Sequence, residues 1–253
     1  MIETILLRCL DPSRQRRFYT HVLGMRGFDD HRVGYGATEA ALQFTKAQAP
    51  YASSSKDRYW KIALAVPDIE LACRQLARDG IAVDGPAQFL DVGYLAHFKD
   101  PEGFTVEVID HAFAGPARVP RDVDQTRFGG GAHLNLLTLR TANIERAQER
   151  CLALGMTALC TQSVPAHDFT LYFYAWTKDR PPRADLSAIE NRSWLYRRPY
   201  TLLELQHRAG AQALNVAEPL SAGYAGFWGG RDGAPPQLLD AAGPFEAVSP
   251  PGP

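Results

Sequence analysis

Hydrophobic and polar positions follow one repeated order along this chain. Three segments each start with a short run of leucine and β-branched residues, continue as a polar amphipathic stretch, and end at a glycine. They begin at Thr4, Lys61 and Leu136, and they end at Gly24, Gly80 and Gly155. An extended apolar run is typical of a strand, whereas apolar residues at i, i+3, i+4 and i+7 indicate a helix with one buried face. Each segment therefore predicts a strand followed by a helix.

The residues at the expected helix ends suit those positions. Asp11, Asp68 and Asn143 each stand seven residues after the first residue of their segment. Aspartate and asparagine side chains accept hydrogen bonds from the exposed N–H groups of a first helical turn. A glycine tolerates the left-handed conformation that closes the last turn. The three copies therefore indicate an internal repeat.

Further strand-like runs follow each helix. The second copy continues with "GIAVDGP", "GYLAHFKDPEG" and "FTVEVID", in which "DPEG" is a strong turn signal. The first copy contains "AALQFT", and the third contains "FTLYFYAW" and "YTLLELQH". A proline-rich, charged insertion at residues 177–199 separates the last two runs, and we expect it to cover a site. The expected fold class is α+β, built from repeated βαβββ modules.

The repeats divide the chain into four parts. Residues 1–112 hold the first two modules, which we expect to pair with each other, and residues 113–130 form a linker. Residues 131–209 form the third module with its inserted loop, and residues 210–253 predict an irregular tail rich in proline and glycine. Three modules leave one without a partner, and an open sheet edge favours association. We therefore expect a homodimer in which the third modules of two chains complete each other.

Composition narrows the classes of partner. Hydrophobic residues make up 45% of the chain, charged residues 22%, and the formal net charge is -1. This balance creates no field that would favour nucleic acid. No apolar stretch approaches the roughly 18 residues of a membrane span, and the N-terminus has no secretory leader pattern. We expect a cytoplasmic protein whose partner is a small molecule, not nucleic acid or a membrane.

Two motifs carry a family resemblance. The run "DPSRQRRFYTHVLGM" and the later run "DPEGFTVEV" resemble the vicinal oxygen chelate superfamily, which includes glyoxalase I, bleomycin-resistance proteins and extradiol dioxygenases. The third module is most similar to glyoxalase I, a lactoylglutathione lyase. The resemblance implies cupped, partly open mixed sheets formed by paired modules. It also implies a divalent metal held by His or Gln on first strands and Glu on last strands. An extradiol dioxygenase would need two histidines and a glutamate, which these positions do not supply.

The resemblance implies metal ligands on first and last strands, but only the last-strand positions carry residue types that could bind a metal. The last-strand positions correspond to Gln43, Glu107 and Glu204, and the first-strand positions correspond to Thr4, Lys61 and Leu136. A protonated lysine has no lone pair, and leucine and threonine are poor ligands for zinc, nickel, manganese or iron. A metal therefore remains open, with Glu107, Glu204 and His133 as its candidate ligands. His133 lies an odd number of residues before Leu136, so it faces the same side only if the strand bends.

The remaining candidates follow from strand faces in the implied cup. We expect Glu107, Glu204 and Lys61 to be catalytic, with Lys61 replacing a metal beside Glu107, anchoring a substrate carboxylate, or acting as a metal-free acid/base partner. Candidate substrate-binding residues are Arg8, Arg140, His97 and Gln43. The resemblance implies that an arginine at the position of Arg140 holds glutathione. His97 fits a structural role as well as a catalytic one.

Two functions remain open at this stage. The first is a lyase or isomerase similar to glyoxalase I that acts on a small oxygenated substrate at a degenerate metal site. The second is a metal-free protein of the bleomycin-resistance type that binds a small molecule in the cup.

Overall fold

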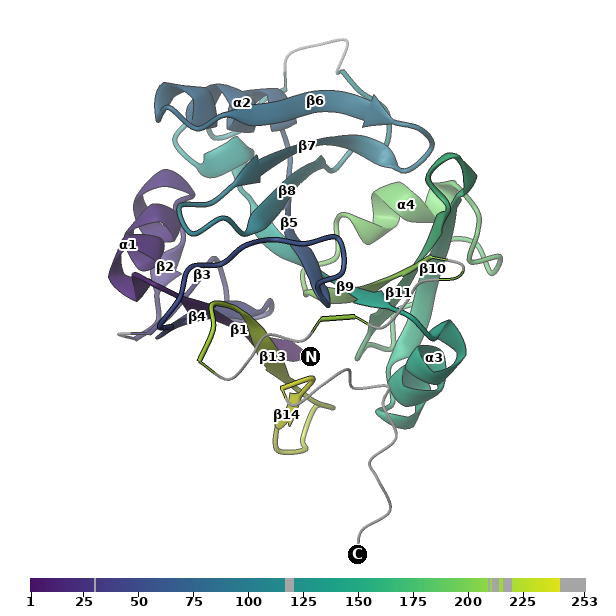
Figure 1. Cartoon of the computed structure of the whole chain (residues 1–253). Coiled ribbons are helices and arrows are strands. Elements are labelled where there is room, and N and C mark those ends of the chain that lie inside the picture. The colour runs from purple at the N-terminus through teal and green to yellow at the C-terminus, as the bar shows by residue number, and fades with distance from the viewer. Residues whose placement is uncertain (30, 117–120, 209, 211–213, 216–219, 242–253) are drawn as a thin grey trace, which may run out of the picture.

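The computed structural model describes the chain except residues 30, 117–120, 209, 211–213, 216–219 and 242–253 (Figure 1). Its strands, in chain order, are β1 (Ile2–Cys9), β2 (Arg26–Gly27), β3 (Arg32–Gly34), β4 (Ala41–Lys46), β5 (Tyr59–Val66), β6 (Val83–Phe89), β7 (Gly93–Lys99), β8 (Thr105–Asp110), β9 (His133–Thr141), β10 (Thr157–Val164), β11 (Phe169–Ala175), β12 (Leu202–Arg208), β13 (Gly223–Gly229) and β14 (Gln237–Leu239). The α-helices are α1 (Pro12–Arg17), α2 (Ile69–Arg78), α3 (Ile144–Ala153) and α4 (Glu190–Leu195). A π-helical turn, Phe18–Val22, continues α1.

The three predicted βαβββ modules are present, and the fold is α+β with mixed sheets. They run from β1 to β4, from β5 to β8 and from β9 to β12. The side chains of Asp11, Asp68 and Asn143 each accept a hydrogen bond from the backbone N–H three residues later. The glycine after each helix has a positive φ, for example 70° at Gly24. The capping residues therefore set the helix boundaries that the sequence predicted.

The modules pair differently from the prediction. The second and third modules share an eight-stranded sheet of order β10-β11-β12-β9-β5-β8-β7-β6, joined by the antiparallel pair of β5 and β9. The predicted pairing of the first and second modules is therefore wrong. The run Ile62–Val66 in β5 is buried on both faces, as expected of a central strand with neighbours on both edges.

The end of the chain supplies the neighbour of the first module. β13 pairs antiparallel with β1, and β14 pairs with β13, which gives the six-stranded sheet β14-β13-β1-β4-β3-β2. Tyr224 and Phe227 of β13 are buried in the core. The prediction of an irregular tail is thus wrong for 223–229 and 237–239, and its last residues, 242–253, lie outside the described part. β13 contains three glycines, a residue type depleted in strands, so its sequence did not suggest a strand.

The proposed basis of the homodimer is also wrong, because the third module already has a neighbour. Its strand β9 lies between β12 and β5, so its first strand presents no open edge. A homodimer stays a prediction, and its interface would have to lie elsewhere.

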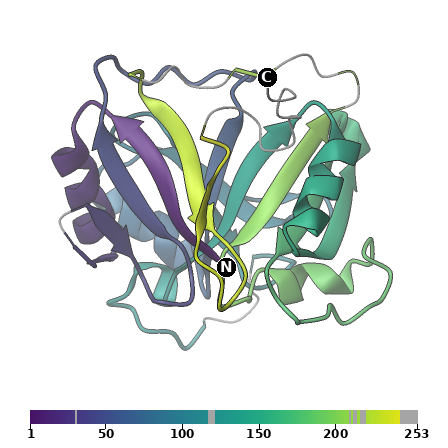
Figure 2. The same ribbon diagram turned by 90° about the horizontal axis from the view of Figure 1, so that it is seen from below.

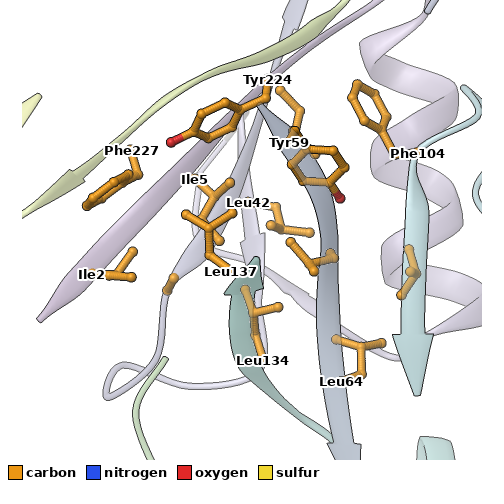
Figure 3. Close-up of a cluster of buried hydrophobic side chains, with 14 of the residues drawn as sticks. Ile2, Ile5, Leu42, Tyr59, Leu64, Phe104, Leu134, Leu137, Tyr224 and Phe227 are labelled. Atoms are coloured by element: carbon orange, nitrogen blue, oxygen red, sulfur yellow. The ribbon is translucent and has the colours of Figure 1, made fainter. Parts of the chain in front are cut away.

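The two sheets share one hydrophobic core. Figure 2 shows them side by side, with α1 and α3 on opposite flanks. Ile5 and Leu42 of the six-stranded sheet face Leu64 and Leu137 of the eight-stranded sheet across this core (Figure 3). No helix in the described part of the chain is long and apolar enough to cross a membrane.

The other face of the eight-stranded sheet forms a second cluster. It contains Ala63, Leu136 and Phe173 from the strands, together with Leu195 and Tyr196 from the insertion. This face, here called the cup, is therefore covered by the insertion. Residues 177–199 thus lie over the surface where the candidate side chains meet.

Candidate functional site

The candidate positions occupy equivalent places in the three modules. In the parallel pair of first and last strands, Gln43 opposes Leu6, Glu107 opposes Ala63, and Glu204 opposes Thr138. Two residues before these partners stand Thr4, Lys61 and Leu136. The modules therefore hold the first-strand and last-strand candidates at one common register, although the residue types differ.

The second and third modules bring a charged cluster together in the cup. Lys61 opposes Thr138 across β5 and β9, and Thr138 opposes Glu204 across β9 and β12. Lys61 Nζ lies 2.5 Å from Glu107 Oε2, and His97 Nε2 lies 3.1 Å from the same oxygen. The Lys61 and Glu107 side chains are 5% and 3% exposed, whereas His97 is 31% exposed. The predicted ion pair is thus confirmed, and His97 links it to solvent.

Attraction within the pair outweighs the cost of burying its charges. Burial acts to raise the pKa of Glu107, but the Lys61 ammonium and the hydrogen bond from His97 lower this pKa to about 2. Burial acts to lower the pKa of Lys61, yet the charges of Glu107 and Glu204 hold it above its usual value. Both partners are therefore ionised at neutral pH.

Glu204 is the member of the cluster that titrates near neutrality. Burial raises the pKa of its carboxyl to about 7, opposed by the attraction of Lys61 and reinforced by the negative charge of Glu107. Its Oε1 is buried and has no hydrogen-bond partner among the described residues, and the same holds for Gln162 Oε1. Buried acceptors of this kind need a donor from water or a ligand. The cup therefore contains a carboxyl that can exchange a proton and oxygen atoms that can accept hydrogen bonds.

Arg140 lies on the same face, near one end of the cup. It opposes Gln206 on β12, and its Nε donates to Gln206 Oε1 at 3.2 Å. Its guanidinium carbon lies 5.5 Å from the centre of the Trp60 ring, and Lys61 Nζ lies 4.6 Å from that ring. Arg140 also donates to the backbone oxygens of Asp57 and Tyr59, which fix its orientation. Arg140 and Lys61 therefore both contact the Trp60 ring, which places Arg140 beside the charged cluster.

Arg8 and Gln43 are not part of this cluster, because they lie on the six-stranded sheet. Arg8 Nε donates to the backbone oxygen of Ser221 at 2.9 Å. Gln43 lines a separate concavity beside α1. The prediction placed the first and second modules around one cup, but the pairing of β1 with β13 separates Arg8 and Gln43 from Glu107 and Glu204.

His133 reaches the cup face by a bend in its strand. Ala63 opposes Leu136 and Ala65 opposes His133, so three steps on β9 correspond to two steps on β5. This register shift turns His133 to the same side as Leu136. However, its ring packs against His111 with 5.4 Å between ring centres, and burial lowers its pKa to about 4. His133 is therefore part of a histidine pair.

The residues in the cup do not fit the divalent metal of the resembled family. The four positions hold Lys61, Glu107, Leu136 and Glu204, so an ammonium and an alkyl group stand where lone-pair donors are required. Lys61 also donates a hydrogen bond to the Glu107 carboxylate, which would otherwise be available to a metal. Within the described residues, no three His, Cys, Asp or Glu side chains gather in a way that could hold a metal ion.

The sequence reasoning missed two residues that close the cup. Tyr196, just after α4, donates its hydroxyl hydrogen to the backbone oxygen of Val92 at 2.7 Å, and Gln162 Nε2 donates to that hydroxyl at 3.2 Å. Arg192 of α4 pairs with Asp91 at 3.0 Å. The insertion of the third module is thus fastened to the β6–β7 turn of the second. The apolar run Trp194, Leu195 and Tyr196 in an otherwise charged insertion was the available signal.

Comparisons with known proteins agree with this architecture. The sequence profile of the Glyoxalase/Bleomycin resistance protein/Dioxygenase superfamily matches residues 1–108. The lactoylglutathione lyases of Salmonella typhimurium and Escherichia coli O157:H7 are each 30% identical over 124 residues, which cover 44% of this chain and 92% of the relative.

Two solved structures share the fold. Glyoxalase I from Zea mays has a TM-score of 0.58 at 20% identity, with 89% of this chain and 72% of that chain covered. A putative dioxygenase from Bacillus subtilis has a TM-score of 0.55 at 14% identity, with 89% and 68% covered. At these identities the likeness concerns the fold alone.

Proposed function

The chain belongs to the Glyoxalase/Bleomycin resistance protein/Dioxygenase superfamily, and from this premise we propose a lyase or isomerase that acts on a small oxygenated substrate in the cup. In this proposal Lys61 takes the place of a divalent metal. The observation that carries it is the contact of Lys61 Nζ with Glu107 Oε2, at two positions that the family uses for metal ligands.

Lys61 supplies fixed positive charge. Its pKa is held above the usual value, so it remains protonated and cannot act as a base at neutral pH. An ammonium group buried in a site of low polarity stabilises negative charge that develops on a nearby oxygen. Glu107 holds Lys61 in position through the ion pair, and we assign the two residues to stabilising an oxyanion.

Glu204 moves the proton. A carboxyl with a pKa of about 7 is present in both protonation states at neutral pH, which suits general acid–base catalysis. The carboxylate would take the proton from a carbon that bears a hydroxyl group beside a carbonyl group. The C–H electron pair then forms the carbon–carbon double bond of an enediolate, and the carbonyl electron pair moves to the oxygen near Lys61. The proton then returns to the adjacent carbon, the hydroxyl proton moves to the oxygen near Lys61, and the first oxygen becomes the new carbonyl, which completes an isomerisation with no net loss of atoms or electrons.

The substrate contacts we propose are Arg140 and His97. Arg140 lies close enough to Trp60 for a cation–π contact and lies on the same strand face as the cluster, so it can receive an anionic group of the substrate. His97 contacts Glu107 and is the partly exposed member of the cluster. Because the curated relatives are lactoylglutathione lyases, a glutathione thiohemiacetal is the first substrate to test.

One observation favours a second candidate, a binding protein without turnover. Lys61 and Glu204 are almost completely buried, and Tyr196 of the insertion packs in the same cluster, close enough for the charge of Glu204 to act on its hydroxyl. His97 is the partly exposed member of the cluster, whereas Lys61 and Glu204 present almost no surface to a substrate. A ligand could instead rest at the rim, near Arg140 and Trp60, with the ion pair as a support beneath it.

The deciding experiment measures turnover in the presence of a chelator. We expect the wild-type protein to isomerise the thiohemiacetal of glutathione and an α-ketoaldehyde at a rate that a chelator does not change. Glu204→Gln should lower kcat about 100-fold or more, because the proton carrier is lost. Glu145→Gln on the exposed side of α3 is the matched control and should leave the rate unchanged.

Two outcomes would contradict the proposal. Complete loss of activity on chelation, with recovery on adding zinc or nickel, would assign the chemistry to a metal. Saturable ligand binding without turnover of thiohemiacetals or hydroxyaldehydes would support the second candidate.

A further inference from the structure

A separate concavity of about 470 Å³ lies in the first module, beside α1. It opens where β3 ends, because β3 covers the edge of β4 only opposite Leu42 and Gln43. Polar side chains from α1, from β4 and from the loop before β3 line it: Ser13, Arg16, His31, Gln43, Thr45 and Lys46. We propose that this concavity binds a small molecule through a phosphate or carboxylate group.

The positive charges at this concavity are oriented but not neutralised. Arg16 Nη2 donates to the backbone oxygen of Asp29 at 3.1 Å, and Lys46 Nζ donates to the backbone oxygen of Leu10. These acceptors are neutral carbonyl groups. Arg16 lines the concavity, and a guanidinium whose recorded acceptor is a neutral carbonyl group can still form a charge-assisted hydrogen bond with an anion.

Two acidic side chains near the concavity, Asp29 and Asp11, have their hydrogen bonds to other groups. The Asp29 carboxylate accepts hydrogen bonds from the backbone N–H groups of His31 and Arg32 and pairs with the Arg32 side chain at 2.6 Å. Asp11 caps α1 through the backbone N–H of Arg14, and this hydrogen bond, more than the charge of Lys46, lowers its pKa. Neither carboxylate forms an ion pair with Arg16 or Lys46 within the described part of the chain.

Neutral donors complete the pocket. Ser13 and Thr45 contribute hydroxyl groups and Gln43 contributes an amide, and the structure records no side-chain hydrogen bonds for these three where it describes the chain. Two cations and several neutral donors around one concavity are the chemistry that recognises an oxyanion. The volume lies in the range of small-molecule sites, and the chain as a whole has a net charge of -1, which does not suit a long polyanion. This proposal does not depend on the chemistry assigned to Lys61 and Glu204.

The test is a titration followed by backbone amide shifts in nuclear magnetic resonance spectra. Inorganic phosphate and acetate are added separately to the full-length protein at about 0.15 M salt, where unspecific surface attraction is screened. We expect saturable shifts centred on Ser13, Gln43 and Thr45. A response to phosphate alone identifies a phosphorylated ligand, and a response to acetate alone identifies a carboxylate ligand.

Charge-removing variants separate the pocket from the general field of the basic helix. Arg16→Gln and Lys46→Gln should each weaken binding about tenfold, because each removes a charge-assisted contact. Arg17→Gln removes one charge from the same helix at an exposed position outside the pocket, and its affinity should stay within about twofold of the wild type. Lys46 is exposed, so its variant should remain folded even if Arg16→Gln does not.

The proposal is overturned if neither anion produces saturable shifts. It is also overturned if Arg17→Gln weakens binding as much as Lys46→Gln, since the effect would then come from the overall charge of α1.

Discussion

Lys61 of β5 and Glu107 of β8 form a buried ion pair on neighbouring parallel strands, with Nζ 2.5 Å from Oε2. Their register differs by two residues, since Glu107 opposes Ala63. The family resemblance implies metal ligands at these two positions, so the ammonium lies where a cation would be expected. A second carboxyl, Glu204, arrives from the third module and shares the electrostatic field of Lys61. The positive charge of Lys61 thus attracts one carboxyl from the second module and one from the third.

A single substitution should restore metal binding. Lys61→His replaces the ammonium by an imidazole and leaves Glu107 and Glu204 free to act as oxygen ligands, which gives a three-ligand set. We expect this variant to retain zinc or nickel through dialysis, at about one ion per chain, whereas the wild-type protein retains none at the cup. Elemental analysis checks this, with Lys178→His on the exposed insertion as the control. A stoichiometric metal in the wild type that survives in the Glu204→Gln variant would place it outside the cup.

Removing only the lysine charge should destabilise the fold. Lys61→Met leaves Glu107 buried without its main counter-charge, and breaking a buried pair in this way costs about 3–5 kcal/mol. Urea unfolding of the variant should show this loss. Lys178→Met changes the same residue type at an exposed position and should alter the free energy of unfolding by less than about 0.5 kcal/mol. If both variants had the same free energy of unfolding, the ion pair would not contribute to stability.

Stability should depend on pH in two windows of opposite sign. The folded pKa of Glu204 is raised from 4.5 to about 7, so its contribution is present below pH 4.5 and is lost as pH rises toward 7. The folded pKa of Glu107 is depressed to about 2, so its contribution is present above 4.5 and is lost as pH falls toward 2. Unfolding free energies measured across pH should lose the first slope in Glu204→Gln, and that variant should retain the second. A wild-type stability that does not change between pH 4.5 and 7 would show that Glu204 is not titrating there.

The local elements could be predicted from sequence because their signals are local. The caps Asp11, Asp68 and Asn143 lie within three residues of the N–H groups they satisfy, and those boundaries were correct. The ion pair of Lys61 with Glu107 was also predicted, because the family resemblance places both positions on the cup face of one module. Both predictions use residues that belong to the same module.

The pairing of strands from different modules could not be predicted from the sequence in the same way. All strand edges offer the same N–H and C=O groups, so sequence order did not reveal that β5 pairs with β9 and β1 with β13. The sequence left the face of His133 conditional on a bend in its strand, and the register shift between β5 and β9 supplies that bend. Tyr196 was missed because the insertion has no periodic pattern and its partner Val92 lies 104 residues away.

The insertion should depend on its tyrosine. Tyr196→Phe removes the donor to the Val92 carbonyl and the acceptor for Gln162 in a buried place, which costs about 1–3 kcal/mol. Hydrogen exchange should then increase in α4 more than in α3. Tyr200→Phe is the matched control, since its hydroxyl contacts Asp179 at the surface and its loss should have little effect. Equal exchange in α4 of wild type and Tyr196→Phe would indicate that other contacts hold the insertion in place.

The C-terminal strand β13 should be essential to the first module. Phe227 is fully buried against the common core, so Phe227→Ala should cost about 3–5 kcal/mol through lost burial and a cavity. Its neighbour Trp228 points to the other side of the sheet and is 39% exposed, so Trp228→Ala should cost less than about 1 kcal/mol. Thermal and urea unfolding of the two variants compare adjacent aromatic positions in one strand. If the two losses were equal, or if Phe227→Ala were neutral, β13 would not pack on the core, and the edge of β1 would need another partner.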